Sequence, residues 1–87
     1  MKITQTTQFK KDVKKQQKRG KDLQRLKDVV GCLILLDVLP AKNRDHALAG
    51  DWAGWRDCHL EPDWLLIYKI SPGEVILGRT GSHADLF

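Results

Sequence analysis

Two short corners constrain the fold more than any other feature of this sequence. Glu61-Pro62-Asp63 and Ser71-Pro72-Gly73 separate three strand-forming runs at residues 52–60, 64–70 and 74–80 or 81. A corner of this length cannot hold the crossover connection that parallel strands require, so neighbouring runs must pair antiparallel. The second half of the chain is therefore predicted to form an antiparallel meander.

Ahead of the meander, apolar residues recur with the period of helices. Phe9, Val13 and Gln16 fall on one narrow arc of a helix over residues 9–20, and basic residues fill the opposite half turn. A second helix over residues 23–37 carries a much wider apolar stripe. Because the break between them is short, the two segments are predicted to form a helical hairpin.

Two helices followed by three antiparallel strands predict an α+β fold, with the N-terminal helical hairpin packed on one face of an antiparallel β-sheet. No repeat or linker interrupts the chain, so a single domain is expected over residues 1–87. Residues 2–6 alternate weakly between apolar and polar and are compatible with a short additional strand.

Composition disfavours several classes of protein. No apolar run approaches the roughly 20 residues needed to span a membrane, and the first residues lack the apolar core of a signal peptide, so we expect no membrane partner and a cytoplasmic location. Cys32 and Cys58 lie in unrelated contexts, which favours two reduced thiols. Cys58 and His59 would point to opposite faces of a strand, and no metal-binding spacing occurs, so no metal is expected. No nucleophile elbow surrounds Ser71 or Ser82, which disfavours a serine hydrolase.

All three histidines lie in the second half of the chain, at loop or strand-end positions: His46, His59 and His83. An antiparallel meander can bring such positions together with Asp63. Imidazole accepts and donates protons near neutral pH, as RNA cleavage through the ribose 2′-hydroxyl requires, and no cofactor is needed. Arg79 or nearby lysines could stabilise the phosphorane charge. Each histidine could equally be an ordinary surface residue.

Core packing is the default expectation for the three tryptophans. On a strand that begins at residue 52, Trp52 and Trp55 would point to opposite faces. Trp64 adjoins Asp63, and Phe87 follows His83 at the C-terminus, so these two aromatic rings are candidates for stacking on an unpaired base. Phe87 could instead plug the core.

Charge is unevenly distributed along the chain. The net charge of +4 combines +8 for residues 1–44 with −4 for residues 45–87. A basic half beside an acidic half suggests that one face meets a polyanion, although a solvated helix surface gives the same pattern.

Three motifs resemble the YafQ branch of the RelE/ParE toxin superfamily. They are Asp-His-x-Leu-x-Gly-x-Trp-x-Gly from residue 45, Arg-Asp-x-His-x-Glu-Pro-Asp-Trp from residue 56, and Arg-Thr-Gly-x-His from residue 79. Members of that family are toxins of type II toxin–antitoxin pairs, small α+β ribonucleases that cut mRNA, typically in the ribosomal A site. The resemblance implies catalytic roles for His46, His59, Asp63 and His83. It implies supporting roles for Arg79, Trp64 and Phe87.

The resemblance also implies partners. The basic face of the first helix would meet ribosomal RNA through Lys10, Lys11, Lys14, Lys15, Lys18 and Arg19, with the ribosome presenting the mRNA. A cognate antitoxin of the DinJ or RelB type would cover this surface with an acidic, largely disordered segment. Two alternatives stay open: a ParE-like toxin that inhibits gyrase without catalysis, and a non-toxic basic RNA-binding module. Three histidines with Asp63 favour the ribonuclease, because a pure binding module does not need them.

Overall fold

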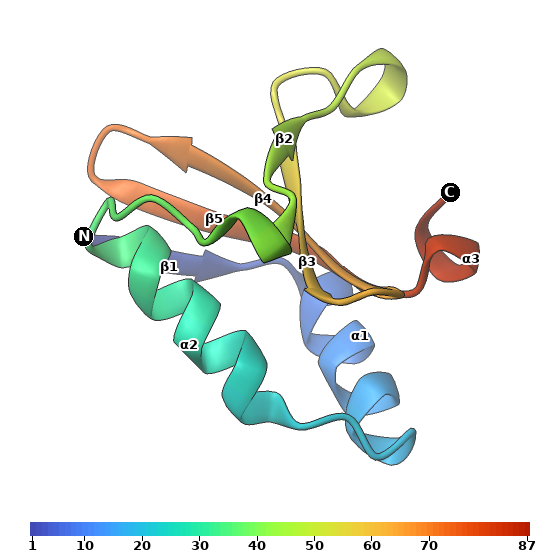
Figure 1. Cartoon of the computed structure of the whole chain (residues 1–87). Helices are drawn as coiled ribbons and strands as arrows, with labels where there is room; N and C mark the ends of the chain where they lie inside the picture. Colours follow the sequence, from blue (N-terminus) through green and yellow to red (C-terminus); the bar gives the residue numbers. More distant parts are fainter.

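The computed structural model describes residues 1–87. A five-stranded sheet in the order β1-β5-β4-β3-β2 forms the centre of the molecule. The helices α1 (Thr7–Lys18) and α2 (Leu23–Ile34) pack on one face, and the short C-terminal helix α3 (His83–Leu86) packs on the other (Figure 1). The predicted α+β fold with an N-terminal helical hairpin is confirmed.

The N-terminus of each helix in the hairpin is fixed by a side-chain hydrogen bond. The Thr6 side chain caps α1 by accepting from the Phe9 N–H at 3.0 Å, and Asp22 caps α2 by accepting from the Gln24 N–H at 3.0 Å. Gly20, with φ 82, closes a Schellman motif that ends α1. The predicted break between the two helices follows from this left-handed glycine.

The second helix ends three residues before the predicted boundary. Leu36 takes a left-handed conformation with φ 57, and the N–H of Asp37 donates to the carbonyl of Cys32 at 3.0 Å. This is again a Schellman ending, built on a leucine where glycine is usual. The prediction that the helix continues to residue 37 is therefore wrong, and Leu35, Leu36 and Val38 are exposed.

The predicted meander is confirmed for the strands β3 (Arg56–Glu61), β4 (Trp64–Ser71) and β5 (Glu74–Gly81). The sheet as a whole is mixed, because β1 (Lys2–Gln5) pairs with β5 in parallel. The prediction of a wholly antiparallel sheet is wrong at this edge. Most of the chain connects β1 to β5, so no short turn forces these two strands to run antiparallel.

The start of β3 also differs from the prediction. Gly54, with φ 90, interrupts the extended chain, and residues 50–52 form a 3₁₀ turn. Trp52 and Trp55 therefore do not alternate across a strand. Their rings meet edge to face at 5.7 Å, and both pack beside Leu65 and Ile67 on the sheet face opposite α1 and α2. His46, predicted in a loop, begins the two-residue strand β2 (His46–Ala47) that pairs with β3.

The cysteines and the helices agree with two further predictions from the sequence. Cys32 and Cys58 are both free thiols, and burial raises the pKa of the Cys58 thiol to about 12, which keeps it protonated and inert. No helix in the chain combines the length and the apolar character needed to cross a bilayer.

Candidate active site

The strand register gathers the predicted acid–base residues on the sheet face that α1 and α2 leave open. His46 pairs with Asp57 across β2 and β3, and His59 pairs with Leu65, which in turn pairs with Gly81 at the end of β5. Residues opposite each other in a sheet point to the same face. The chain then continues through Ser82 to His83, whose ring centroid lies 5.5 Å from that of His59.

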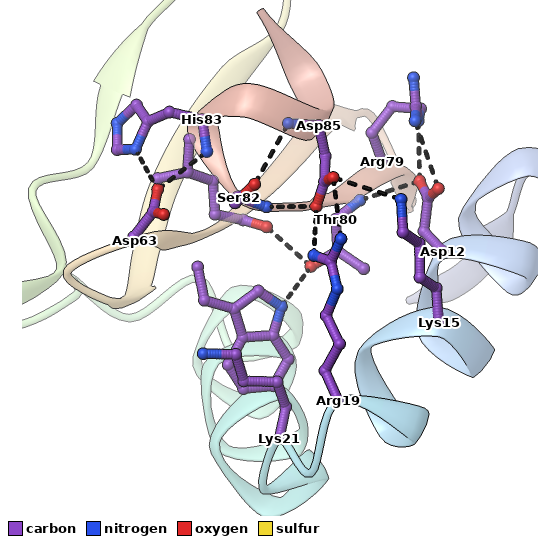
Figure 2. Close-up of polar contacts among 12 residues, drawn as sticks. Asp12, Lys15, Arg19, Lys21, Asp63, Arg79, Thr80, Ser82, His83 and Asp85 are labelled. Atoms are coloured by element: carbon purple, nitrogen blue, oxygen red, sulfur yellow. Dashed lines mark hydrogen bonds and ion pairs between the residues drawn. The ribbon is translucent and has the colours of Figure 1, made fainter.

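His83 is held by the carboxylate of Asp63, at the corner between β3 and β4. The Asp63 Oδ1 accepts from the His83 backbone N–H at 2.9 Å and lies 2.6 Å from the ring Nδ1 (Figure 2). These two hydrogen bonds from His83, with the backbone bond the larger cause, lower the pKa of Asp63. Because a carboxylate accepts, Nδ1 carries the proton and Nε2 is left for proton exchange with a substrate.

His46 is oriented by the backbone carbonyl of Arg44 and lies beside Asp57. Its Nδ1 donates to the Arg44 carbonyl oxygen at 2.8 Å, which places the proton on Nδ1, and lies 3.1 Å from the Asp57 Oδ1, a buried oxygen that accepts no hydrogen bond. Asp57 is 3% exposed, and burial raises its pKa despite three histidines nearby. The sequence analysis missed Asp57. Its signal is the spacing of two residues before His59, which puts both side chains on one strand face.

His59 is half-buried and fixed through the backbone. Its carbonyl accepts from the Asn43 Nδ2 at 2.7 Å. Glu61, two residues later, pairs with Lys21 at 2.8 Å and Arg25 at 3.5 Å and so ties the corner to the start of α2. Of the four predicted catalytic residues, the structure therefore brings His59, Asp63 and His83 into one cluster, and His46 adjoins it through Asp57.

Arg79 is paired with a buried acid from α1. Its Nε lies 2.7 Å from the Asp12 Oδ2, and the same oxygen accepts from the backbone N–H of Thr80 at 3.2 Å (Figure 2). The Arg79 side chain keeps 27% of its surface exposed, so the oriented guanidinium still reaches solvent. The sequence analysis also missed Asp12, although it is the one acid within the basic segment before Asp22.

The two predicted stacking residues differ in their exposure to solvent. Trp64 is fully buried, and its Nε1 donates to the Thr80 Oγ1 at 2.9 Å, so the default expectation of core packing is confirmed and its ring is not available to stack on a base. Trp64 opens β4 on the face that α1 and α2 cover, which turns its ring into the core. Phe87 is 61% exposed beside α3 and remains a stacking candidate rather than a core plug.

The basic face of α1 is divided between two environments. Lys15 and Arg19 form ion pairs with Asp85 of α3. The other four cations predicted to bind RNA are exposed and form no ion pair: Lys10, Lys11, Lys14 and Lys18. Four of the six cations predicted to bind RNA therefore remain available for phosphate contacts.

No group of three or more His, Cys, Asp or Glu side chains gathers with a geometry that could hold a metal ion. The Nδ1 atoms of His46 and His83 are already engaged in hydrogen bonds, with the Arg44 carbonyl and with Asp63. The donor set does not fit a resident metal, and the metal-independent reaction stays a prediction.

Fold and site together define a class of protein: a small α+β domain arranged for acid–base chemistry on one open sheet face. The whole chain, residues 1–87, matches the family described as bacterial toxin of type II toxin–antitoxin system, YafQ. The chain belongs to this family, so the predicted family and toxin class are confirmed.

Individual relatives agree with this assignment. The mRNA interferase toxin YafQ of Escherichia coli K12 is 49% identical over 86 residues, which cover 98% of this chain and 94% of the relative. The YafQ chain of an E. coli DinJ–YafQ complex is 49% identical, with a TM-score of 0.90 and coverage of 98% and 96%. A copper-bound mutant toxin from Helicobacter pylori is 38% identical, with a TM-score of 0.96 and coverage of 100% and 99%. The predicted enzyme class is confirmed at the level of the family, since the YafQ toxins of two E. coli strains, both 49% identical to this chain, are named mRNA interferases.

Proposed function

We propose that this chain is the toxin of a type II pair and cleaves mRNA on the ribosome by general acid–base catalysis, without a metal. The observation that carries the proposal is the juxtaposition of His59 with His83, whose ring centroids lie 5.5 Å apart. Two imidazoles at this separation can serve the two proton transfers of one displacement at phosphorus. The family assignment favours this reaction over a gyrase inhibitor or a non-catalytic RNA-binding module.

In the proposed reaction the ribose 2′-oxygen attacks the neighbouring phosphorus. A neutral imidazole takes the 2′-hydroxyl proton as the 2′-O–P bond forms. A protonated imidazole gives its proton to the 5′-oxygen as the P–O5′ bond breaks, which leaves a 2′,3′-cyclic phosphate and a 5′-hydroxyl. The Nε2 atom of His83 suits one of these transfers because its Nδ1 is engaged by Asp63, and the neighbouring ring of His59 serves the other. His46, with its Nδ1 on the Arg44 carbonyl, also presents a free Nε2 next to this pair.

The remaining predicted residues support the chemistry from its surroundings. Arg79, oriented by Asp12, supplies positive charge for the developing phosphorane. Phe87 offers an exposed ring on which a displaced base can stack. Trp64 supports the site by packing beneath it, through its hydrogen bond to Thr80. All of these groups belong to the single toxin domain proposed for residues 1–87.

The proposed partners follow from charge and from the relatives. The exposed lysines of α1 attract RNA phosphates without reading sequence, which suits docking on ribosomal RNA in the cytoplasm. An E. coli YafQ was solved with DinJ. We therefore propose a DinJ-like antitoxin for this chain, with an acidic segment that covers the same cations.

The proposal is tested by His59→Ala and His83→Ala, expressed in cells and purified for cleavage of mRNA on programmed ribosomes. Each variant should relieve growth arrest, and its single-turnover rate should fall by about 10²- to 10⁴-fold, as for loss of a general acid or base. Asp28→Ala, at an exposed position on α2, is the matched control. If both histidine variants fold and stay as toxic as the parent chain, the catalytic assignment fails.

The same assay in EDTA tests metal independence, which the copper-bound relative makes worth measuring. Spermidine keeps the ribosomes intact when magnesium is removed. Cleavage should persist in EDTA. Activity that disappears and returns on addition of zinc or copper would contradict the metal-independent mechanism.

A further inference from the structure

The helix α3 carries His83, yet its four residues are too few to form a helix unaided, because the first helical turn is costly to nucleate. Its position therefore depends on contacts with the rest of the chain. Leu86 anchors one side of the helix by packing beside Leu65 and Ile67. The other side is anchored by Asp85, a carboxylate that takes no part in the proposed chemistry (Figure 2).

Asp85 collects donors from two elements. Its Oδ2 accepts from the Arg19 Nη1 at 2.6 Å and from the Ser82 N–H at 2.9 Å, and its Oδ1 accepts from the Arg19 Nη2 at 3.2 Å and the Lys15 Nζ at 3.3 Å. Ser82 returns a hydrogen bond from its hydroxyl oxygen to the Asp85 N–H, which completes a capping box. The Arg19 pair is bidentate, the geometry that fixes orientation best.

The carboxylate is packed as well as paired. The Asp85 side chain is 15% exposed, although Lys15 and Arg19 are 56% and 40% exposed. A Cβ at Gly81 would lie 2.9 Å from the Asp85 side chain, so the last residue of β5 must be glycine for Asp85 to sit where it does. An isolated surface ion pair contributes little to stability, but this one combines a bidentate arginine, a lysine and a helix cap.

Asp85 lies two residues after His83, the proposed proton carrier. His83 meets Asp63 through both its backbone N–H and its ring Nδ1, so its position requires that the backbone of α3 stay in place. Phe87 continues from the same helix, with its N–H on the His83 carbonyl at 2.9 Å. Movement of α3 would therefore displace the imidazole, the Asp63 contact and the stacking ring together.

We propose that Asp85 is a positioning residue for His83: paired with Arg19 and Lys15, it ties α3 to α1 and holds His83 against Asp63. The proposal rests on the proposed function. It reassigns Lys15 and Arg19, which the sequence analysis placed among RNA-binding residues, to the architecture of the site. The cations that face Asp85 are Lys15 and Arg19 from α1, with Arg79 of β5 close by.

The test compares Asp85→Asn, Arg19→Ala and the double variant on mRNA-programmed ribosomes, with Lys27→Ala as control. In Asp85→Asn, asparagine keeps an oxygen for the Ser82 N–H. Arg19→Ala leaves the capping box untouched, so it still tests the proposal if Asp85→Asn does not fold. Each single variant should lower the maximal single-turnover rate by about 10- to 100-fold while the half-saturating toxin concentration stays within about twofold. The double variant should lose no more than either single one, because both break the same contact. Lys27, exposed on α2 and without an ion pair, should leave both values unchanged.

A second readout does not depend on cleavage. The pKa of Asp63 is lowered chiefly by the His83 backbone N–H, so Asp85→Asn should raise it toward the ordinary aspartate value, as measured by carbon-13 NMR of the carboxyl group. Lys21 and Arg19 also face Asp63, and both are unchanged in Asp85→Asn, so this readout uses that single variant. An unchanged Asp63 pKa and rate in folded Asp85→Asn would overturn the proposal, whatever the fate of the catalytic assignment. Losses that multiply in the double variant, with a raised half-saturating concentration for Arg19→Ala, would assign Arg19 to RNA binding instead.

Discussion

The buried carboxylate of Asp57 lowers the stability of the fold but lies beside His46, a proposed proton carrier. Asp57 is 3% exposed, and burial raises its pKa, which means that the folded state disfavours the charged form. The same carboxylate lies 3.1 Å from the Nδ1 of His46, where its charge stabilises the protonated imidazole. A group that destabilises the fold yet stabilises the charge of a proton carrier is typical of an active site, where stability is given up for function.

Asp57→Asn should separate these two effects. Because the folded pKa lies above the unfolded one, the folded state binds the extra proton, so stability falls as pH rises from the unfolded pKa through the folded pKa and stays reduced above it. Asparagine removes this loss, so urea unfolding at pH 7 should give a larger free energy of unfolding than for the parent chain. Cleavage should fall by about tenfold or more, because a protonated His46 loses the carboxylate charge beside it, whereas the Arg44 carbonyl still accepts from its Nδ1.

The exposed Asp51→Asn is the control for Asp57→Asn and should change neither quantity. A variant that is less stable than the parent chain at every pH between 4 and 8 would contradict the assigned cost of burying Asp57.

Residue types at strand ends were enough to predict which side chains would meet. His59, Asp63 and His83 meet as expected, since a three-residue corner and a meander leave few other arrangements. Asp57 and Asp12 were missed because a single aspartate in a strand or a basic helix has the same pattern as a solvated one. Core packing, the default expectation for Trp64, is confirmed, because β4 begins at Trp64 as predicted and its ring lies with Leu66 and Tyr68 in the core. Its position next to Asp63 in the sequence did not place the two side chains on one face.

At the scale of elements, β5 supports the site by passing directly beneath Trp55. A Cβ at Gly78 would lie 2.6 Å from the Cζ3 atom of the Trp55 ring. The pairing of β4 with β5 also shifts register here, between Ile67 and Tyr68. Trp55 in turn packs against Trp52 and covers the open sheet face, so this glycine lets the segment before β3 close over the sheet.

Gly78→Ala should therefore destabilise the fold by about 1 to 3 kcal/mol, the usual cost of overpacking a core, with a change in tryptophan fluorescence. Gly31→Ala is the matched control in the interior of α2, where nothing lies within 4 Å of the added Cβ. It should instead stabilise by up to about 1 kcal/mol through helix propensity. Equal effects of the two substitutions in chemical denaturation would contradict the contact with Trp55.

Elements with strong local signals could be predicted and the others could not. The helical hairpin follows from two apolar stripes and Gly20, a residue suited to the left-handed conformation. The end of α2 was missed because Leu36 takes that conformation against its usual preference. The parallel pairing of β1 was missed because it joins the two most distant strands in the chain, and no local pattern encodes such a contact.

At the scale of the whole molecule, the charge asymmetry of the sequence becomes an arrangement of surfaces. The cations of α1 that face α3 are neutralised by Asp85, whereas Lys10, Lys14 and Lys18, at successive helix turns, face solvent without an ion pair. The open sheet face instead carries acidic groups with the histidines. Under the proposed function, RNA attraction and RNA cleavage therefore belong to different parts of the surface, so they can be altered independently.

Reversal of Lys10, Lys14 and Lys18 to glutamate should therefore weaken ribosome association without disturbing the catalytic cluster. Each phosphate contact releases counterions, so the slope of log association constant against log salt should become shallower by about 2 to 3. The control reverses Lys2, Lys27 and Lys42, which makes the same change in net charge on β1, α2 and the following loop. Sedimentation with ribosomes at several salt concentrations measures both slopes. If the two triple variants give the same slope, the molecule is attracted by its net charge alone, and α1 is not the docking surface.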